Sequence, residues 1–348
     1  MKRYLHLTLI TSILLSLSCT VRAQSTCAQI LRTARATYDQ GKLHELPGLL
    51  EGCLKSGFSK QEKVEAYKLL TLAYIYLEEP AKADEAMLQL LRTDSYFEIN
   101  ESADPAEFIA LYKTFRTSPV YRIGARLGVN ATKPSVVSSV YAIDGSSSSY
   151  KPGISFQVGA TLEIPINKKL TLNPELNFQV KSFKFTSTLA LDNNQSNSSE
   201  GKESHSWVSI PVILQYKINE SKFNPYVGLG VAGDYLLNAK IVMARNRVNA
   251  TSIQERTYDI SEVRNSINIS AVAAGGIKLK LGSGYVISEL RIIYGITSIN
   301  NANSAFAISD YLLFDNGYAD SIIRLNSVTF TAGYIYNVFN PKKIKRKK

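Results

Sequence analysis

Near its C-terminal end the chain alternates between apolar and polar side chains. Over residues 328–339, Phe330, Tyr334 and Tyr336 occupy one set of alternate positions, and Thr329 and Thr331 belong to the other. Successive side chains of a β-strand point to opposite faces, so this segment is expected to be a strand with one apolar, aromatic-rich face.

The same alternation recurs along the chain from about residue 120. Its second face carries charges, amides, hydroxyls and glycine, and is too polar for the core of a soluble sheet. An apolar face toward lipid and a polar face toward the lumen is the arrangement of a transmembrane β-barrel. The pattern therefore predicts an all-β, up-and-down transmembrane barrel of about eight antiparallel strands, the smallest usual size. The expected strands cover residues 120–129, 154–164, 170–181, 208–217, 227–232, 267–278, 286–296 and 328–339.

The connections between these strands alternate in length. Three are short, at residues 167–169, 219–222 and 282–284, and four are long and polar, at residues 132–152, 192–206, 239–266 and 300–326. Outer-membrane barrels have short periplasmic turns and long external loops. We therefore expect an outer-membrane location with both termini in the periplasm. Within the last long loop, the apolar stretch at 306–314 is expected either to fold over the barrel mouth or to contact a partner.

The first residues have the features of a secretory signal peptide, residues 1–23. Lys2 and Arg3 precede an apolar run over residues 5–17, and cleavage is expected after Ala23. Cys19 leaves a lipoprotein anchor as the alternative. The apolar run is too short to cross a membrane as a helix.

Residues 24–118 are expected to form a periplasmic all-α domain. Apolar residues recur at helical spacing in five segments of this part, which we expect to pair as helical hairpins. Cys27 opens the first expected helix and Cys53 closes the second, so an antiparallel pair would bring them together. In an exported protein such a pair favours a disulfide.

The helical part resembles tetratricopeptide-type helix pairs. Ala34, Tyr38 and Gly41 stand where such repeats carry small, aromatic and turn residues, and Leu72 with Tyr76 resembles a second copy. The resemblance implies a concave surface that binds a protein partner. The alternative is a helical bundle that only packs.

The net charge of +11 is partly concentrated in a basic C-terminal tail, residues 340–348. The other basic residues are scattered, so nucleic acid is not an expected partner. The tail is expected to lie against anionic lipid head groups. The chain has 20 Tyr and one Trp, which suits the aromatic girdles of a barrel.

Charged residues at inward positions of the expected strands form the main candidate site. Ionisable residues at membrane depth are functional candidates, but in a small barrel they also pair with one another and fill the lumen. We expect a plug of ion pairs, with a conducting path as the alternative. The predicted lumen cluster comprises Arg122, Arg126, Glu163, Glu175, Lys181, Lys217, Lys278, Glu289 and Arg291.

His205 is the one hint of an enzyme. With Ser204 and Ser206 it would suit a lipid-modifying hydrolase, but it is expected at the end of a Ser-rich loop, where serine is ordinary composition. No metal-ligand spacing or phosphate-binding loop occurs, so no cofactor, metal or catalytic residue is expected.

Two resemblances concern the barrel. The last strand resembles the C-terminal assembly signal of bacterial outer-membrane proteins, carried by Gly333, Tyr336, Val338 and Phe339, which implies the barrel-assembly machinery as a partner. The region from 118 to 339 resembles the PorT-like outer-membrane barrel family of Bacteroidetes. The residues that carry this second resemblance lie at 207–216, 224–230 and 289–295.

The PorT-like resemblance implies outer-membrane residence and, for some members, a part in secretion or gliding machinery. The expected function is a non-enzymatic barrel, residues 119–339, that anchors the helical domain for binding another envelope protein. The alternatives are a small-solute channel and a lipid-modifying enzyme. The expected partners are outer-membrane lipid, the barrel-assembly machinery and a periplasmic or outer-membrane protein.

Overall fold

The computed structural model describes residues 27–139, 147–190, 196–219, 223–247, 251–300, 316, 318 and 321–344. It divides into two compact units, one formed by residues 1–119 with 339–348 and the other by residues 120–338. The expected signal peptide, the apolar stretch at 306–314 and the last four tail residues lie outside the described part. Among the described residues, no helix is both long and apolar enough to cross a membrane.

The helical unit is built from short amphipathic helices. A helix over residues 27–39 is followed by η1 (Leu43–Glu45), α2 (Leu46–Lys55), α3 (Lys60–Tyr76), α4 (Pro80–Thr93) and α5 (Ala106–Tyr112). The apolar stripes of these helices meet in two buried clusters, which contain Leu46, Leu50 and Ala66 in one and Met87 and Phe108 in the other. The all-α character expected of this part is confirmed.

Local signals fix the ends of these helices. Ser59 begins α3 with a capping box, in which its hydroxyl accepts from the Glu62 N–H and the Glu62 carboxylate accepts from the Ser59 N–H at 2.8 Å. Gly41 follows the first helix with φ +75°, a backbone conformation that suits glycine. The predicted Cys27–Cys53 disulfide is present and joins the first helix to α2, with Cα atoms 5.7 Å apart.

The C-terminal segment belongs to the helical unit. The Arg116 N–H donates to the Lys342 carbonyl at 2.9 Å, the Ile344 N–H donates to the Thr114 carbonyl at 2.8 Å, and Phe115 and Lys343 form an antiparallel bridge. Tail residues 340–344 therefore pair with residues 114–116, because an extended backbone is satisfied by an adjacent extended strand. The expected contact of the basic tail with lipid head groups stays a prediction.

Side chains strengthen this pairing. Lys343 forms an ion pair with Asp84 of α4, and the Phe339 ring packs edge-on against Tyr96 with ring centroids 4.8 Å apart. The Arg116 guanidinium donates to the Asn340 carbonyl at 2.6 Å. We call residues 339–344 the C-terminal strap.

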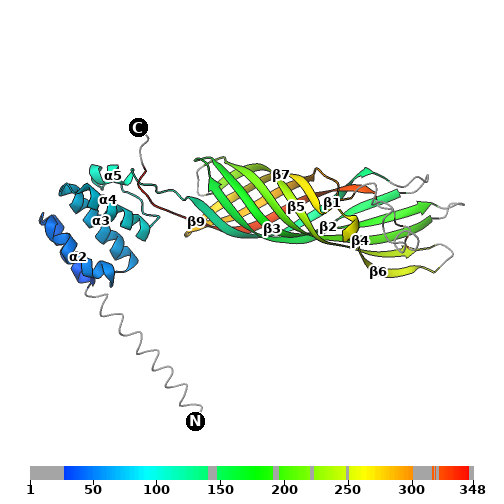
Figure 1. The fold of residues 1–348 in the computed structure, drawn as a ribbon, viewed down its shortest axis with the longest axis horizontal. Coiled ribbons are helices and arrows are strands. Elements are labelled where there is room, and N and C mark those ends of the chain that lie inside the picture. Colours follow the sequence, from blue (N-terminus) through cyan, green and yellow to red (C-terminus); the bar gives the residue numbers. More distant parts are fainter. Residues whose placement is uncertain are drawn as a thin grey trace, which may run out of the picture. The chain divides into compact units, whose positions relative to one another are not determined.

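The second unit is a closed antiparallel barrel, shown as the cylinder of strands in Figure 1. The strands from β1 to β6 pair in chain order, as do β7, β8 and β9, while β5 also pairs with β7 and β1 pairs with β9. Eight of the nine described strands close the cylinder, and β6 pairs only with the far end of β5. The up-and-down barrel with about eight strands is thus confirmed. The strands are β1 (Tyr121–Ser138), β2 (Ser147–Pro165), β3 (Leu170–Ala190), β4 (Ser196–Lys217), β5 (Phe223–Asn246), β6 (Ile253–Asp259), β7 (Ile267–Leu281), β8 (Gly284–Gly295) and β9 (Ile322–Val338).

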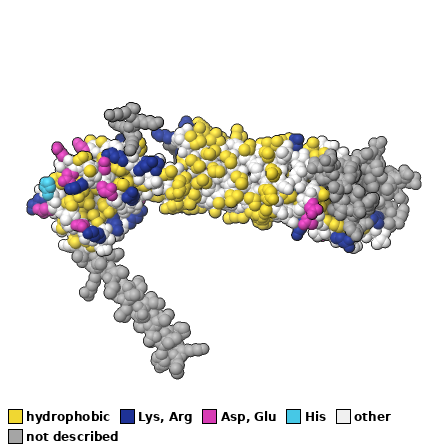
Figure 2. All heavy atoms as spheres, viewed as in Figure 1, with side chains coloured by type: hydrophobic (Ala, Val, Ile, Leu, Met, Phe, Trp, Pro, Cys, Tyr) yellow, Lys and Arg dark blue, Asp and Glu magenta, His cyan; other side chains and the backbone are white. Residues whose placement is uncertain are grey.

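The outer face of the barrel is apolar over much of its length, as Figure 2 shows. Ile154, Leu229 and Leu127 are 79%, 71% and 68% exposed, whereas inward neighbours such as Glu163 and Asn173 are completely buried. Exposed apolar and buried polar side chains are the reverse of a soluble sheet, and match the predicted lipid-facing and lumen-facing sides.

Toward the long loops this polarity reverses. Many inward side chains there are apolar and form a buried cluster that includes Phe183, Trp207, Ile241 and Leu325, beside the buried polar residues Glu203 and His205. Outward side chains there include exposed Lys184. This is the pattern of an ordinary water-exposed sheet around an apolar core.

This reversal corrects the expected loop boundaries. Much of the segments 192–206 and 239–266 is strand, because β4 begins at Ser196 and β5 continues to Asn246. His205, which was expected in a loop, lies inside β4 and is buried.

Candidate functional site

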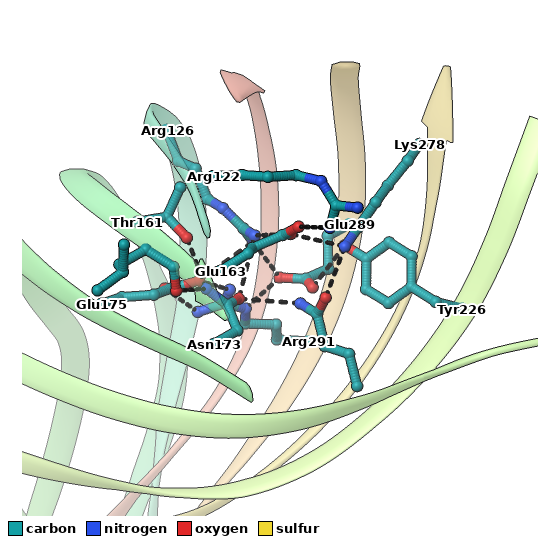
Figure 3. A network of polar contacts seen from close by, with 12 residues as sticks. Arg122, Arg126, Thr161, Glu163, Asn173, Glu175, Tyr226, Lys278, Glu289 and Arg291 are labelled. Carbon is teal, nitrogen blue, oxygen red and sulfur yellow. Dashed lines mark hydrogen bonds and ion pairs between the residues drawn. The ribbon is translucent and has the colours of Figure 1, made fainter. Parts of the chain in front are cut away.

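The predicted charges converge inside the barrel, in the part nearer the short turns. Figure 3 shows the side chains of β1, β2, β3, β5, β7 and β8 reaching the same volume from around the wall. They meet because each occupies an inward position of its strand and the strands are in register: Arg122 lies opposite Glu163, and Glu289 lies opposite Gly276. We call this group the lumen network.

Arg126 of β1 is the centre of the network. Its guanidinium lies 2.9 Å from Glu289, 3.2 Å from Glu175 and 3.8 Å from Glu163, which come from three different strands. It also donates to the Asn173 side chain at 3.2 Å. One planar cation with five N–H donors can serve several acceptors at once, which a lysine ammonium cannot do in this geometry.

A glycine makes room for Arg126. Gly333 of β9 lies directly opposite it, and a Cβ at that position would lie 3.0 Å from Arg126 Cγ and 2.3 Å from the Ala125 carbonyl oxygen. Gly333 was also predicted as part of an assembly signal, so its place beside Arg126 gives it a packing role as well.

Arg291 of β8 forms the second strong contact. It donates two parallel hydrogen bonds to the Glu175 carboxylate, at 2.6 and 2.8 Å, and its Nε donates to Glu289. Bidentate pairs of this kind are among the strongest charge-assisted hydrogen bonds. Tyr226 donates to the other oxygen of Glu289 at 2.7 Å. The Tyr226 hydroxyl lies against Gly276, and a Cβ on Gly276 would be only 2.7 Å from the hydroxyl oxygen.

Glu163 closes the network on the side of the short turns. Lys278 donates to it at 2.6 Å and Arg122 at 3.3 Å. Lys278 also donates to the Gln215 side chain at 2.7 Å, and Arg122 donates to Asn337 at 2.9 Å. These neutral amides satisfy donors that the carboxylates cannot reach.

The network is dense and nearly neutral. Arg122, Arg126, Lys278 and Arg291 face Glu163, Glu175 and Glu289, so four cations meet three carboxylates. The three carboxylate side chains are completely buried. A buried charge is tolerated only when it is paired and hydrogen-bonded, and each of these carboxylates has at least two donors.

The spaces around the network are small. A cavity of about 50 Å³ opens at the short-turn end beside Arg122, Lys217 and Lys278. On the other side, a void of about 10 Å³ lies between Arg291 and Asp234. The smaller space is about the size that holds one water molecule.

Two predicted members lie outside the network. Lys181 is nearer the long loops, where it forms a buried ion pair with Asp234 at 2.7 Å and its ammonium lies 5.8 Å from the centre of the Trp207 ring. Lys217 lines the cavity at the short turns. Of the predicted assembly signal, Gly333, Tyr336 and Val338 lie in β9, whereas Phe339 belongs to the C-terminal strap.

Several members of the network were not predicted. Tyr226, Asn173, Gln215 and Thr161 all contribute hydrogen bonds. Their inward parity could have identified them, because each directly adjoins an outward apolar residue in the sequence. Attention to charged residues alone left them out.

In the described structure, His205 contacts a carboxylate rather than Ser204 or Ser206. Its Nε2 lies 2.6 Å from Glu203, which also accepts from Arg264 Nε at 2.7 Å. Ser204 and Ser206 alternate to the opposite face of β4. In the part of the chain that the structure describes, no group of three or more His, Cys, Asp or Glu is arranged to hold a metal ion.

Comparisons with solved structures return outer-membrane proteins. OprG from Pseudomonas aeruginosa is 13% identical, with a TM-score of 0.34, over 64% of this chain and 98% of that one. Neisserial surface protein A is 12% identical, with a TM-score of 0.31, over 62% and 96%. The attachment invasion locus protein of Yersinia pestis is 12% identical, with a TM-score of 0.25, over 62% and 99%.

A comparison with curated protein sequences gave no match. A model of one protein family, described as an outer membrane protein beta-barrel domain, matches residues 120–301. This match spans more than half of the chain. It covers the barrel from β1 to the end of β8 and does not include β9. The chain therefore belongs to the outer membrane protein beta-barrel domain family, and its barrel lies in the outer membrane.

Proposed function

We propose that this protein is a non-conducting, non-enzymatic anchor that holds its helical unit in the periplasm, where that unit binds another envelope protein. The lumen network carries the proposal. Paired charges from five strands fill the barrel interior near the short turns, and toward the long loops an apolar cluster fills it. A solute path would require breaking both.

The helical unit offers a surface for a partner. An open groove of about 390 Å³ runs between α2 and α3, lined by residues that include Pro47, Leu54, Tyr67, Leu70 and Tyr74. Aromatic and aliphatic side chains beside a few charges are the usual composition of a protein-binding groove. The tetratricopeptide-like residues support the same role.

The remaining parts of the proposal concern orientation and pathway. The alternation of short turns and long loops supports termini in the periplasm. The PorT-like segments support membership of an envelope assembly such as secretion or gliding machinery. The basic lining of the small cavity at the short-turn end does not alter this proposal, because the network lies directly behind it.

In-cell cross-linking of the tagged full-length protein, followed by mass spectrometry of outer-membrane extracts, tests the anchor role. We expect a recurrent envelope protein that is lost when residues 24–118 are deleted. It should also be lost in Leu54→Ala/Tyr74→Ala, which alters the groove. Gln61→Ala, an exposed residue of α3 outside the groove lining, is the matched control. If the same partner is captured from the deletion and from every variant, the anchor role is wrong.

Conductance in planar bilayers tests the closed lumen. The purified full-length protein should give no steady ionic current. Current through the wild-type barrel would favour the small-solute channel instead.

A further inference from the structure

Three lysines stand side by side on the outer face of the barrel. Lys151 of β2 pairs in register with Lys184 of β3, which pairs in register with Lys202 of β4. All three are exposed. We call them the lysine row.

A bulge brings Lys151 into this row. Between Pro152 and Gln157 the register of β2 against β3 shifts by one residue. Ile154 and Phe156 face outward on one side of the shift, so without it Pro152 would face outward and Lys151 inward. A β-bulge re-aims side chains in this way.

A glycine stands at this bulge. A Cβ on Gly153 would lie 2.3 Å from the Ser182 carbonyl oxygen, so the close approach of the two strands requires glycine.

The lysine row is electrostatically unfavourable by itself. Like charges directly opposite one another on neighbouring strands repel. None of the three lysines forms an ion pair with a carboxylate in the described residues. Glu200 and Glu255 line the same shallow hollow of about 600 Å³, and still leave it one positive charge in excess. An external anion would relieve the repulsion.

The row lies just beyond the apolar band. Lys184 is four residues past Val180, the last apolar residue before it on the outward face of β3. That spacing is about 13 Å along a strand, or roughly 10 Å along the membrane normal at a usual strand tilt. The head-group layer is about 5 to 7 Å deep, so the Lys184 backbone lies just beyond it, and a long lysine side chain can reach back to the phosphates in that layer. Figure 2 shows charged side chains beyond the yellow band at this end of the barrel.

We propose that Lys151, Lys184 and Lys202 bind the phosphate groups of a glycolipid head group in the outer leaflet. The lipid is favoured over a soluble anion because the row adjoins the lipid-facing surface and faces away from the lumen. The inference rests on the proposed orientation, in which the long loops are external.

The test is a binding titration of full-length protein in zwitterionic detergent with fluorescent diphosphoryl lipid A. Lys151→Gln/Lys184→Gln/Lys202→Gln should weaken binding roughly 100-fold, since each lysine near an anionic surface contributes about fivefold. Lipid A without its phosphates should bind the wild-type protein as weakly as the triple variant binds the phosphorylated lipid.

The matched control removes the same charge elsewhere. Lys168→Gln/Lys169→Gln/Lys280→Gln changes three exposed lysines near the short turns and should alter affinity by less than about twofold. Heat-modified migration on a gel verifies that every variant is folded.

Equal losses of affinity in the two triple variants, or tight binding of dephosphorylated lipid A, would overturn the proposal. Binding of inorganic phosphate without lipid A would also overturn it and assign the row to a soluble anion. The titration uses purified protein, so its outcome is independent of partner capture and of conductance.

Discussion

Replacing Glu289 by Gln would test whether the lumen network supports the barrel. Glu289 accepts hydrogen bonds from Arg126, Arg291 and Tyr226. The substitution keeps the side-chain volume and leaves an amide oxygen for Tyr226, but it leaves four cations facing two carboxylates. Breaking a buried ion pair by removing one partner costs about 3–5 kcal/mol.

The urea dependence of unfolding gives the measurable shift. With a denaturant slope of about 3 kcal/mol per M, the midpoint should fall by about 1 to 1.7 M. Trp207, the one tryptophan of the chain, is completely buried in the barrel, so its fluorescence reports on this unit in phosphatidylcholine vesicles. Glu255→Gln, an exposed position on β6, is the control and should change the free energy of unfolding by less than about 0.5 kcal/mol.

Coupling to Arg126 sharpens the test. Adding Arg126→Gln to Glu289→Gln removes one excess cation, so the double variant should be less destabilised than the sum of the two single variants. If Glu289→Gln unfolds within about 0.5 kcal/mol of the wild-type protein, the network does not support the barrel.

Three further predictions concern the helical unit. Replacing Cys27 and Cys53 by Ser opens a loop with a sequence separation of 26 residues, which should lower the free energy of unfolding of this unit by about 3.5 kcal/mol and leave the unfolding temperature of the barrel unchanged. An unchanged melting temperature of the helical unit would contradict this. Ser59→Ala removes the capping box with Glu62 and should cost about 1 kcal/mol in thermal unfolding, whereas Ser56→Ala, outside that box, should cost less. Deleting residues 340–348 removes the strand partner of 114–116 and should speed proteolysis of the helical unit with unchanged heat-modified migration of the barrel; equal cleavage rates would show that the strap adds nothing.

The faces of the strands in the membrane band could be predicted because one rule governs them. Side chains alternate with a period of two, and lipid requires one face to be apolar, so Leu127 and Arg126 could be assigned to opposite faces from sequence alone. The helices were predictable for a similar reason, since their apolar residues recur at a single spacing.

The ends of β3, β4 and β5 near the long loops were predicted as loops, because the apolar and polar faces of the strands exchange there. Beyond the lipid the outer face meets water, so Lys184 and Lys202 point outward while Phe183 and Ile241 fill the interior. A search for outward apolar residues interprets such segments as loops. His205 was assigned to a loop for that reason. A test for alternating polar and apolar residues that does not specify which of them faces outward would have placed it in a strand.

The composition of the lumen network was predictable, but its connections were not. Inward parity indicates that Arg126 and Glu175 face the lumen, but it does not say which strands lie across it. The distances depend on the register and stagger of strands that are far apart in the chain, such as β3 and β8. The separation of Lys181 from the network is likewise a matter of height in the barrel, which a short sequence motif does not encode.

The C-terminal strap makes the order of synthesis matter. Residues 27–112 are synthesised before the barrel, but the segment that pairs with residues 114–116 is synthesised after every described barrel strand. A chain that ends before β9 lacks the strand that closes the barrel onto β1. It also lacks the C-terminal strap, which pairs with residues 114–116 of the helical unit. The helical unit is therefore complete only after residues 340–344, which follow β9, have been made.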